Sequence, residues 1–222
     1  MDKEKLNIAV SDSLGTVSAE LMADKSIKAL YVFAHGAGAG MNHPFMVKLS
    51  TALFALSIGT LRYNFPFMEK GSKRPDPPAI AEKTVNRAIE VARELYPAVP
   101  LLAGGKSFGG RMTSQALAKT TNSGVKGIVF VGFPLHAPGK AGSDRANHLA
   151  SVSIPMLFLQ GTRDALANME LMEKVCADHP LATLQKFEGA DHSFKAGKQE
   201  LITPLAEAIG DWIPRLGSIE RT

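Results

Sequence analysis

The hydrophobic positions of this chain fall into short runs, each closed by a Gly, Pro or Asx break and followed by a segment with helical spacing. Five runs are almost continuously apolar: 29–34, 59–64, 101–103, 127–131 and 156–159. Such runs are typical of strands covered on both faces, as in parallel sheets. A sixth run, 183–187, alternates as an edge strand does, and runs 6–10 and 17–21, on either side of 13–15, predict an N-terminal hairpin.

Apolar residues at helical spacing predict helices between these strands. The clearest helix follows Asp76, a suitable N-cap, with Pro77 at the first helical position and Pro97 at the end. Four more are expected at 44–57, from Ser107, after Asp164, and at a C-terminal apolar face formed by Leu205, Ala208, Ile209 and Trp212. This alternation predicts an α/β fold: a mostly parallel central sheet with helices on both faces.

One irregular stretch, 135–151, fits either a short helix or a loop over the sheet edge. The chain shows no internal repeat, low-complexity segment or linker. Its 222 residues suffice for one well-filled domain over 1–222 and do not require two. We therefore expect a single domain with no sizeable cap.

The composition, 45% hydrophobic and 21% charged residues, is that of an ordinary globular enzyme. No apolar run approaches the roughly 20 residues that span a bilayer. The polar start, Met1–Lys5, is unlike a signal segment, so we expect a cytoplasmic protein without a membrane partner.

The net charge of +4 is mildly basic, which favours anionic substrates or surfaces. The densest basic patch, Lys70–Arg74, is short and carries no aromatic residue. We interpret it as a solvated loop and expect no nucleic-acid partner. The sequence gives no indication of an oligomeric state.

Residues typical of metal and redox sites are sparse. Cys176 is the single cysteine, which excludes an internal disulfide and agrees with a reducing compartment. It falls in an expected helix, where a buried apolar role is favoured over a reactive thiol. His35 and His43 lie close together, but without an H-E-x-x-H motif or a Cys/His cluster they are a poor metal signal. We expect neither a metal nor a cofactor.

The pentapeptide 105–109, Gly-Lys-Ser-Phe-Gly, follows the apolar run 100–103 directly and matches the G-x-S-x-G nucleophile elbow. That motif holds a serine on a sharp strand-to-helix turn, and the flanking glycines leave room for the turn. The alternative is that Ser107 is only a helix N-cap. The strand before it and the helix after it favour a nucleophile.

The small-residue loop 35–40 follows the first long strand and predicts an oxyanion hole. Backbone N–H groups there can point at a developing negative charge. The nucleophile elbow takes one donor from the residue after the serine, here Phe108, and one from this loop. Ala37 is our candidate for the second donor, with Gly38 next. His35 is either catalytic or, as we favour, a brace for the loop.

Two further segments at strand ends offer the acid and the base. Asp164 follows the strand that ends at Leu159, with an N-cap as its alternative role and Asp144 as its rival. His192 follows the last strand, on a loop suited to a general base. Its neighbour Asp191 is interpreted as structural, because adjacent side chains diverge. Ligand sites in parallel sheets form at the carboxyl ends of strands, where all these segments lie.

The order Ser107, Asp164, His192 is that of the α/β-hydrolase triad. The chain resembles small capless α/β hydrolases of the dienelactone-hydrolase-like group, most closely a branch with His-Gly-Ala-Gly and Gly-Gly-Lys-Ser-x-Gly-Gly-Arg near the positions of 35–38 and 104–111. The resemblance spans nearly the whole chain. It implies these three residues as nucleophile, acid and base. Dienelactone hydrolase itself uses a cysteine nucleophile, so that activity is not carried over.

We therefore expect a serine hydrolase that cleaves a small ester or thioester through an acyl-enzyme on Ser107, with a small-molecule acyl substrate. A chromatin-associated eukaryotic subunit is similar to the same branch, so a weakly catalytic binding or scaffold protein is the alternative. A peptidase ranks third. Lys106 and Arg111 are solvent-facing or paired with carboxylates. Six residues after strand ends are acyl-pocket candidates, with core packing as the alternative: Phe65, Phe67, Phe133, Leu135, His136 and Phe194.

Overall fold

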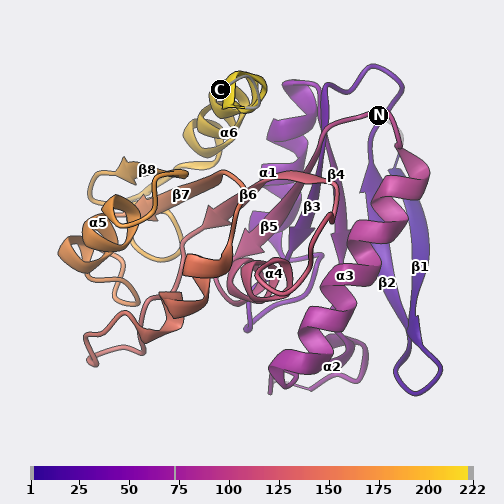
Figure 1. Cartoon of the computed structure of the whole chain (residues 1–222), viewed down its shortest axis with the longest axis horizontal. Helices are drawn as coiled ribbons and strands as arrows, with labels where there is room; N and C mark the ends of the chain where they lie inside the picture. The colour runs from indigo at the N-terminus through magenta and orange to yellow at the C-terminus, as the bar shows by residue number, and fades with distance from the viewer. Residues whose placement is uncertain (1–2, 73, 220–222) are drawn as a thin grey trace.

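The predicted strands form one eight-stranded sheet in the order β1-β2-β4-β3-β5-β6-β7-β8 (Figure 1). The fold is that of a computed structural model, which describes residues 3–72 and 74–219. The antiparallel pairs are β1 with β2 and β2 with β4, and every later pairing is parallel. The strands are β1 (Lys3–Ser11), β2 (Gly15–Met22), β3 (Ala29–Ala34), β4 (Ile58–Tyr63), β5 (Leu101–Lys106), β6 (Val125–Val131), β7 (Met156–Gly161) and β8 (Ala182–Phe187).

The hydrophobic pattern predicted the character of these strands correctly. β3, β4 and β7 are buried at every position, as continuous apolar runs indicate. The hairpin of β1 and β2 is confirmed, and β8 lies at the edge of the sheet. Strand β5 continues three residues beyond its predicted end, because Gly104 and Gly105 still pair with both β3 and β6. A small second sheet, β9 (Lys195–Ala196) with β10 (Gln199–Glu200), was not predicted.

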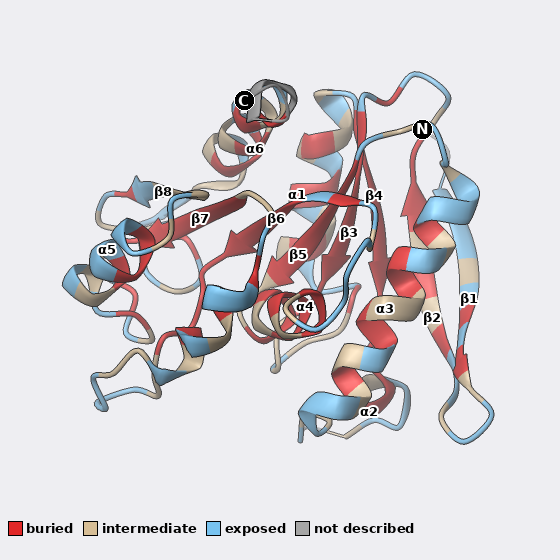
Figure 2. Ribbon diagram, in the orientation of Figure 1, coloured by how far each residue is buried: buried red, intermediate tan, exposed pale blue. Residues whose placement is uncertain are grey.

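Helices cover both faces of the sheet, as predicted (Figure 1). α1 (Pro44–Ala55) and α6 (Ile202–Ile219) contact each other and share one buried cluster with the sheet. α3 (Pro78–Leu95), α4 (Phe108–Leu117) and α5 (Met169–Ala177) belong to a second cluster on the other face. Figure 2 shows the central strands β3 to β7 buried between these layers, whereas the edge strands β1 and β8 are largely exposed or half-buried. None of the described helices is long and apolar enough to cross a membrane.

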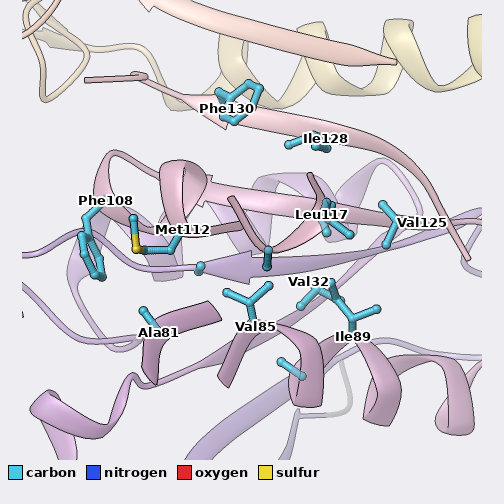
Figure 3. Close-up of a cluster of buried hydrophobic side chains, with 14 of the residues drawn as sticks. Val32, Ala81, Val85, Ile89, Phe108, Met112, Leu117, Val125, Ile128 and Phe130 are labelled. Carbon is cyan, nitrogen blue, oxygen red and sulfur yellow. The ribbon is translucent and has the colours of Figure 1, made fainter. Parts of the chain in front are cut away.

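The second cluster fixes helix α4, which follows Ser107. Phe108, Met112 and Leu117 of α4 pack between α3 and the sheet (Figure 3). Met112 is completely buried. Each such side chain contributes roughly 1.5–3 kcal/mol by leaving water, so the helix behind the serine is firmly held.

One predicted helix start was wrong by a residue. Helix α3 begins at Pro78, and Pro77 occupies the N-cap position with an extended ψ of 148°. The reason is steric: a residue that precedes a proline is steered out of the helical region, and Pro77 precedes Pro78. Asp76 does not cap α3. Its Oδ2 instead accepts a hydrogen bond of 2.9 Å from the N–H of Phe67, in the short helix α2 (Pro66–Glu69).

The irregular stretch 135–151 contains a 3-10 helix, η1 (Asp144–Ser151), so a short helix occupies its second half. Cys176 is buried in α5, as expected. Burial raises the pKa of this thiol to about 12, which leaves it unreactive at neutral pH.

Candidate active site

Ser107 stands on a sharp turn between β5 and α4. Its backbone has φ 51° and ψ −113°, a conformation that residues with side chains rarely adopt. The flanking glycines permit the turn: a Cβ on Gly105 would lie 2.3 Å from the Ala34 carbonyl oxygen, and one on Gly109 would lie 2.5 Å from that of His35. Ser107 occupies the N-cap position but makes no side-chain capping bond. The N-cap interpretation therefore does not account for its hydroxyl.

The structure brings together the three side chains that were predicted to meet. His192 Nε2 lies 2.9 Å from Ser107 Oγ, and His192 Nδ1 lies 2.7 Å from Asp164 Oδ2. A carboxylate only accepts hydrogen bonds, so Nδ1 carries the proton and the Nε2 lone pair faces the serine hydroxyl. About a quarter of the His192 side chain is exposed, whereas that of Asp164 is fully buried. This geometry is the one that a nucleophile, a base and an orienting acid require.

Asp164 is fixed by more than the histidine. Its Oδ2 also accepts from the Gln160 side-chain amide at 2.6 Å, and its Oδ1 accepts from the N–H of Leu166 at 2.8 Å. It does not cap the following helix, since α5 is capped by the side chain of Asn168. Each oxygen of the buried carboxylate thus has a donor, as a buried charge requires.

The two other carboxylates considered from the sequence lie elsewhere. Asp144 begins η1, and no hydrogen bond or ion pair joins it to His192 in the described residues. The Oδ1 of Asp191 accepts from the N–H groups of Ser193 at 2.8 Å and Lys195 at 3.0 Å. Asp191 therefore shapes the turn that carries His192, which agrees with the structural role expected for it.

The loop after β3 runs beside Ser107. A Cβ on Gly36 would lie 3.8 Å from that of Ser107. His35 braces this loop: its Nδ1 bonds the Gly36 carbonyl at 2.7 Å, and its Nε2 accepts from the N–H of Phe65 at 3.0 Å. Burial lowers the pKa of His35 to about 4, so its ring is neutral. Both ring nitrogens are occupied by the backbone, which favours the bracing interpretation over a catalytic one.

The far end of the same loop is also held by two polar side chains, the buried Arg62 and the half-buried Asn64. Arg62 Nη1 donates to the Met41 carbonyl at 2.5 Å, and Asn64 Oδ1 accepts from the Met41 N–H at 2.8 Å. By contrast, no hydrogen bond to the N–H of Ala37 or Phe108 is found within residues 3–72 and 74–219. These two amides are the predicted oxyanion donors, and the lack of a protein partner for each is what that role requires.

A cleft of about 570 Å³ contains Ser107 and His192. Its walls come from the loop after β3, the start of α1, and single residues of later loops. Its lining is mixed. The apolar side chains are Ala37, Ala39, Pro44, Phe45, Met46 and Leu166, and the charged ones are Lys106, Lys195 and Glu200. The six acyl-pocket candidates from the sequence do not line it. Five of these six are buried in the core, namely Phe65, Phe67, Phe133, Leu135 and Phe194.

Residues of the loop 35–40, Ser107 and His192 line the cleft as expected, whereas Phe45 and Met46 were not predicted because they come from a helix start. Phe45 and Met46 lie in the first turn of α1, which His43 caps through its ring nitrogen. The sequence identified this helix but not the direction of its first turn. His136 also has a structural role, since its Nε2 accepts from the N–H of Asn168 at 2.9 Å.

Lys106 and Arg111 were expected to face solvent or pair with carboxylates. Neither forms an ion pair with a carboxylate in the part of the chain that the structure describes. Lys106 instead donates from Nζ to the backbone carbonyl of His192 at 2.6 Å. The described residues contain no cluster of three or more His, Cys, Asp or Glu that could hold a metal ion.

The fold and this hydrogen-bonded arrangement together define the class of the α/β hydrolases. A family model for the alpha/beta hydrolase domain matches residues 27–210. The chain therefore belongs to the α/β-hydrolase family, and its class of enzyme is that of the hydrolases.

Solved structures agree with this assignment at the level of the fold. The chain is similar to a dienelactone hydrolase from Anabaena variabilis, with a TM-score of 0.80 and 17% identity over 96% of this chain and 97% of that one. It is also similar to an α/β serine hydrolase without a lid from Xanthomonas campestris, with a TM-score of 0.75 and 17% identity over 96% and 95% of the two chains. Est1E from Butyrivibrio proteoclasticus gives a TM-score of 0.74 and 13% identity over 96% and 99%. The predicted fold without a sizeable cap is confirmed.

Proposed function

We propose that this protein is a serine hydrolase that cleaves a small carboxylic ester or thioester through an acyl-enzyme on Ser107. The observation that carries the proposal is the chain of two hydrogen bonds, 2.9 Å and 2.7 Å, from the Ser107 hydroxyl through His192 to the buried Asp164. A serine hydroxyl is a weak nucleophile until a neighbouring base accepts its proton. His192 is placed to accept it.

In the proposed reaction, Ser107 Oγ attacks the acyl carbon while His192 Nε2 takes the hydroxyl proton. Asp164 holds the imidazole in the required tautomer and stabilises the imidazolium. The carbonyl oxygen becomes an oxyanion that accepts hydrogen bonds from the N–H groups of Ala37 and Phe108. His192 then gives its proton to the leaving alkoxide or thiolate. Each oxyanion donor is worth a factor of about 10²–10³ in rate.

The second half of the reaction uses the same groups with water in place of the alcohol. His192 removes a proton from a water molecule, which attacks the acyl carbon and forms the second oxyanion. Collapse of this intermediate breaks the bond to Ser107 Oγ, and the serine recovers its proton from the imidazolium. The products are a carboxylic acid and the regenerated enzyme. The chemistry requires no redox group or co-reactant besides water.

The cleft supports a small acyl substrate. Its volume of about 570 Å³ lies within the usual range for small-molecule sites, and the apolar side chains in its wall suit a hydrocarbon acyl group. An esterase domain from Rhodothermus marinus and a cold-adapted esterase from an Arctic metagenomic library have similar folds. We place the enzyme in the cytoplasm, a proposal that the single cysteine supports, since it allows no internal disulfide.

A panel of p-nitrophenyl esters and matched thioesters of graded acyl length tests the proposal. We expect turnover of short acyl chains by the wild type and none above background by Ser107→Ala. The better leaving-group class in the panel then identifies the ester or thioester preference. A wild type that hydrolyses no member of either series contradicts the proposal and favours the binding or scaffold alternative.

A further inference from the structure

Lys106 has no part in the reaction above, yet its side chain reaches into the same site. It is the last residue of β5, directly before Ser107. Its Nζ donates a hydrogen bond of 2.6 Å to the main-chain carbonyl of His192, which is 86 residues away in the sequence. Lys106 is thus joined to Ser107 by the peptide bond and to His192 by a side-chain hydrogen bond. The contact goes to the backbone of the histidine, so both ring nitrogens keep their bonds to Asp164 and Ser107.

The ammonium also lies near two aromatic rings, one from the loop that carries His192 and one from the start of α1. Nζ lies 5.6 Å from the ring centre of Phe194 and 6.0 Å from that of Phe45, within the range of cation–π attraction. Gly132 leaves space for it, since a Cβ there would stand 3.1 Å from Nζ. Phe194 has a φ of 58°, so the loop is in an unfavourable conformation that needs such contacts. Lys106 therefore holds the loop at both His192 and Phe194.

The charged groups that act on Lys106 are the carboxylates of Asp164 and Asp191. The imidazole of His192 is also near, since a Cβ on Gly132 would lie 3.1 Å from Nζ and 3.5 Å from His192 Cε1. Both carboxylates favour the ammonium form. Burial opposes them and is the larger effect, so the pKa of Lys106 falls to about 8. The lysine is charged at neutral pH and loses its proton in mildly alkaline solution.

We propose that Lys106 is a positioning residue, whose ammonium holds the main chain of His192 so that the imidazole stays within hydrogen-bond distance of Ser107. This inference rests on the proposed function. A charge-assisted hydrogen bond is about twice as strong as a neutral one, and cation–π attraction needs the charge. Loss of the lysine proton therefore loosens the loop. A displacement of about 1 Å at a reacting group can cost about 100-fold in rate.

The kinetic test compares Lys106→Met, Lys106→Arg and the surface control Lys186→Met across pH 6–10, with a p-nitrophenyl ester as substrate. Lys106→Met is expected to lower kcat about 10- to 100-fold with little change in KM, the size typical of lost supporting contacts. The wild type is expected to lose activity through pH 8 as pH rises, and this alkaline limb is absent from Lys106→Met. Lys106→Arg keeps the charge and retains more of kcat. Wild-type kcat in Lys106→Met, with the alkaline limb unchanged, overturns the inference.

A second measurement needs no turnover and separates this inference from the proposed function. The His192 Nδ1 proton bonded to Asp164 should give a downfield NMR resonance, assigned by its loss in His192→Gln. We expect it to shift or broaden in Lys106→Met, and to do so in the wild type as the pH passes 8. A resonance unmoved by both changes overturns the inference, even if the wild type is an active esterase. If the wild type hydrolyses no ester, the proposed function fails while this resonance still tests Lys106.

Discussion

Asp164 Oδ2 lies 2.7 Å from His192 Nδ1, and the aspartate side chain has no exposed surface. The same carboxylate accepts hydrogen bonds from Gln160 and Leu166, so it is held from several directions. Because a carboxylate cannot donate, it fixes the proton on Nδ1 and leaves Nε2 to accept from Ser107. The tautomer of the base therefore depends on one buried acid.

Asp164→Asn is the substitution that tests this dependence. An amide NH₂ at this position donates towards Nδ1 and favours the wrong tautomer, so we expect kcat to fall by about 10⁴-fold. The matched control is Asp144→Asn, which changes the rival carboxylate and should leave kcat at the wild-type level. Steady-state hydrolysis of a p-nitrophenyl ester measures both. A large loss in Asp144→Asn with none in Asp164→Asn would reverse the assignment of the acid.

The strained backbone of Ser107 predicts that the turn which exposes the serine hydroxyl lowers the stability of the fold. Its φ of 51° costs of order 1–3 kcal/mol for a residue with a side chain. Glycine adopts this φ without strain, whereas alanine does not. We expect Ser107→Gly and Ser107→Ala to be equally inactive, with Ser107→Gly the more stable by about 1 kcal/mol after its larger unfolded-state entropy is subtracted. Urea unfolding of the pair measures the difference, and a more stable alanine variant would show that the turn is not strained.

Gly109, the last residue of the elbow pentapeptide, is required because there is no space beside it for a side chain. A Cβ on Gly109 would lie 2.5 Å from the His35 carbonyl oxygen and 2.7 Å from both Ala34 Cβ and its carbonyl carbon. Gly109→Ala must therefore push α4 away from β3, and overpacking of this kind costs about 1–3 kcal/mol. Gly142→Ala is the control, since nothing lies within 4 Å of its Cβ position. Thermal melting should show a loss for the first variant alone, and equal melting temperatures would contradict the close packing.

The lowered pKa of Lys106 predicts that this group raises the free energy of unfolding as pH rises from about 8. Its pKa is about 8 in the folded protein and near its ordinary value of 10.5 when unfolded. Between these values the unfolded chain holds one more proton, so this group makes the folded state more stable as pH rises. Below pH 8 the buried charge is a net cost that Lys106→Met removes. We expect that variant to melt higher than the wild type at pH 7 and the gap to narrow towards pH 10. If Lys106→Met is less stable than the wild type at pH 7, Lys106 is a net stabiliser of the folded state.

The predictable parts of the site are those that depend on a short motif or on the strand just before a residue. The G-x-S-x-G pattern behind an apolar run places Ser107 on a strand-to-helix turn, and the chain order of Asp164 and His192 follows from strands that precede each of them. Because the carboxyl ends of parallel strands share one edge of the sheet, these side chains had to come near each other. The hydrogen-bond lengths then follow from the packing of the loops.

The remaining features depend on contacts between distant segments. The position of β4 between β2 and β3 could not be predicted from the hydrophobic pattern. The pattern shows which residues are buried but not which strands pair with each other. Phe45 enters the cleft through the orientation of a helix start, and Lys106 bonds a carbonyl 86 residues away. The shift at Pro77 was within reach, since the following Pro78 already disfavours a helical residue there.

The most direct test of the central claim is intact-protein mass spectrometry after treatment with a fluorophosphonate. The Ser107 oxygen would displace fluoride from phosphorus and keep the phosphonyl group as a stable ester. We expect one adduct on the wild type, located on Ser107 by peptide mapping, and none on Ser107→Ala. An adduct of equal yield on Ser107→Ala, or an unlabelled wild type, would contradict the assignment of Ser107 as the nucleophile.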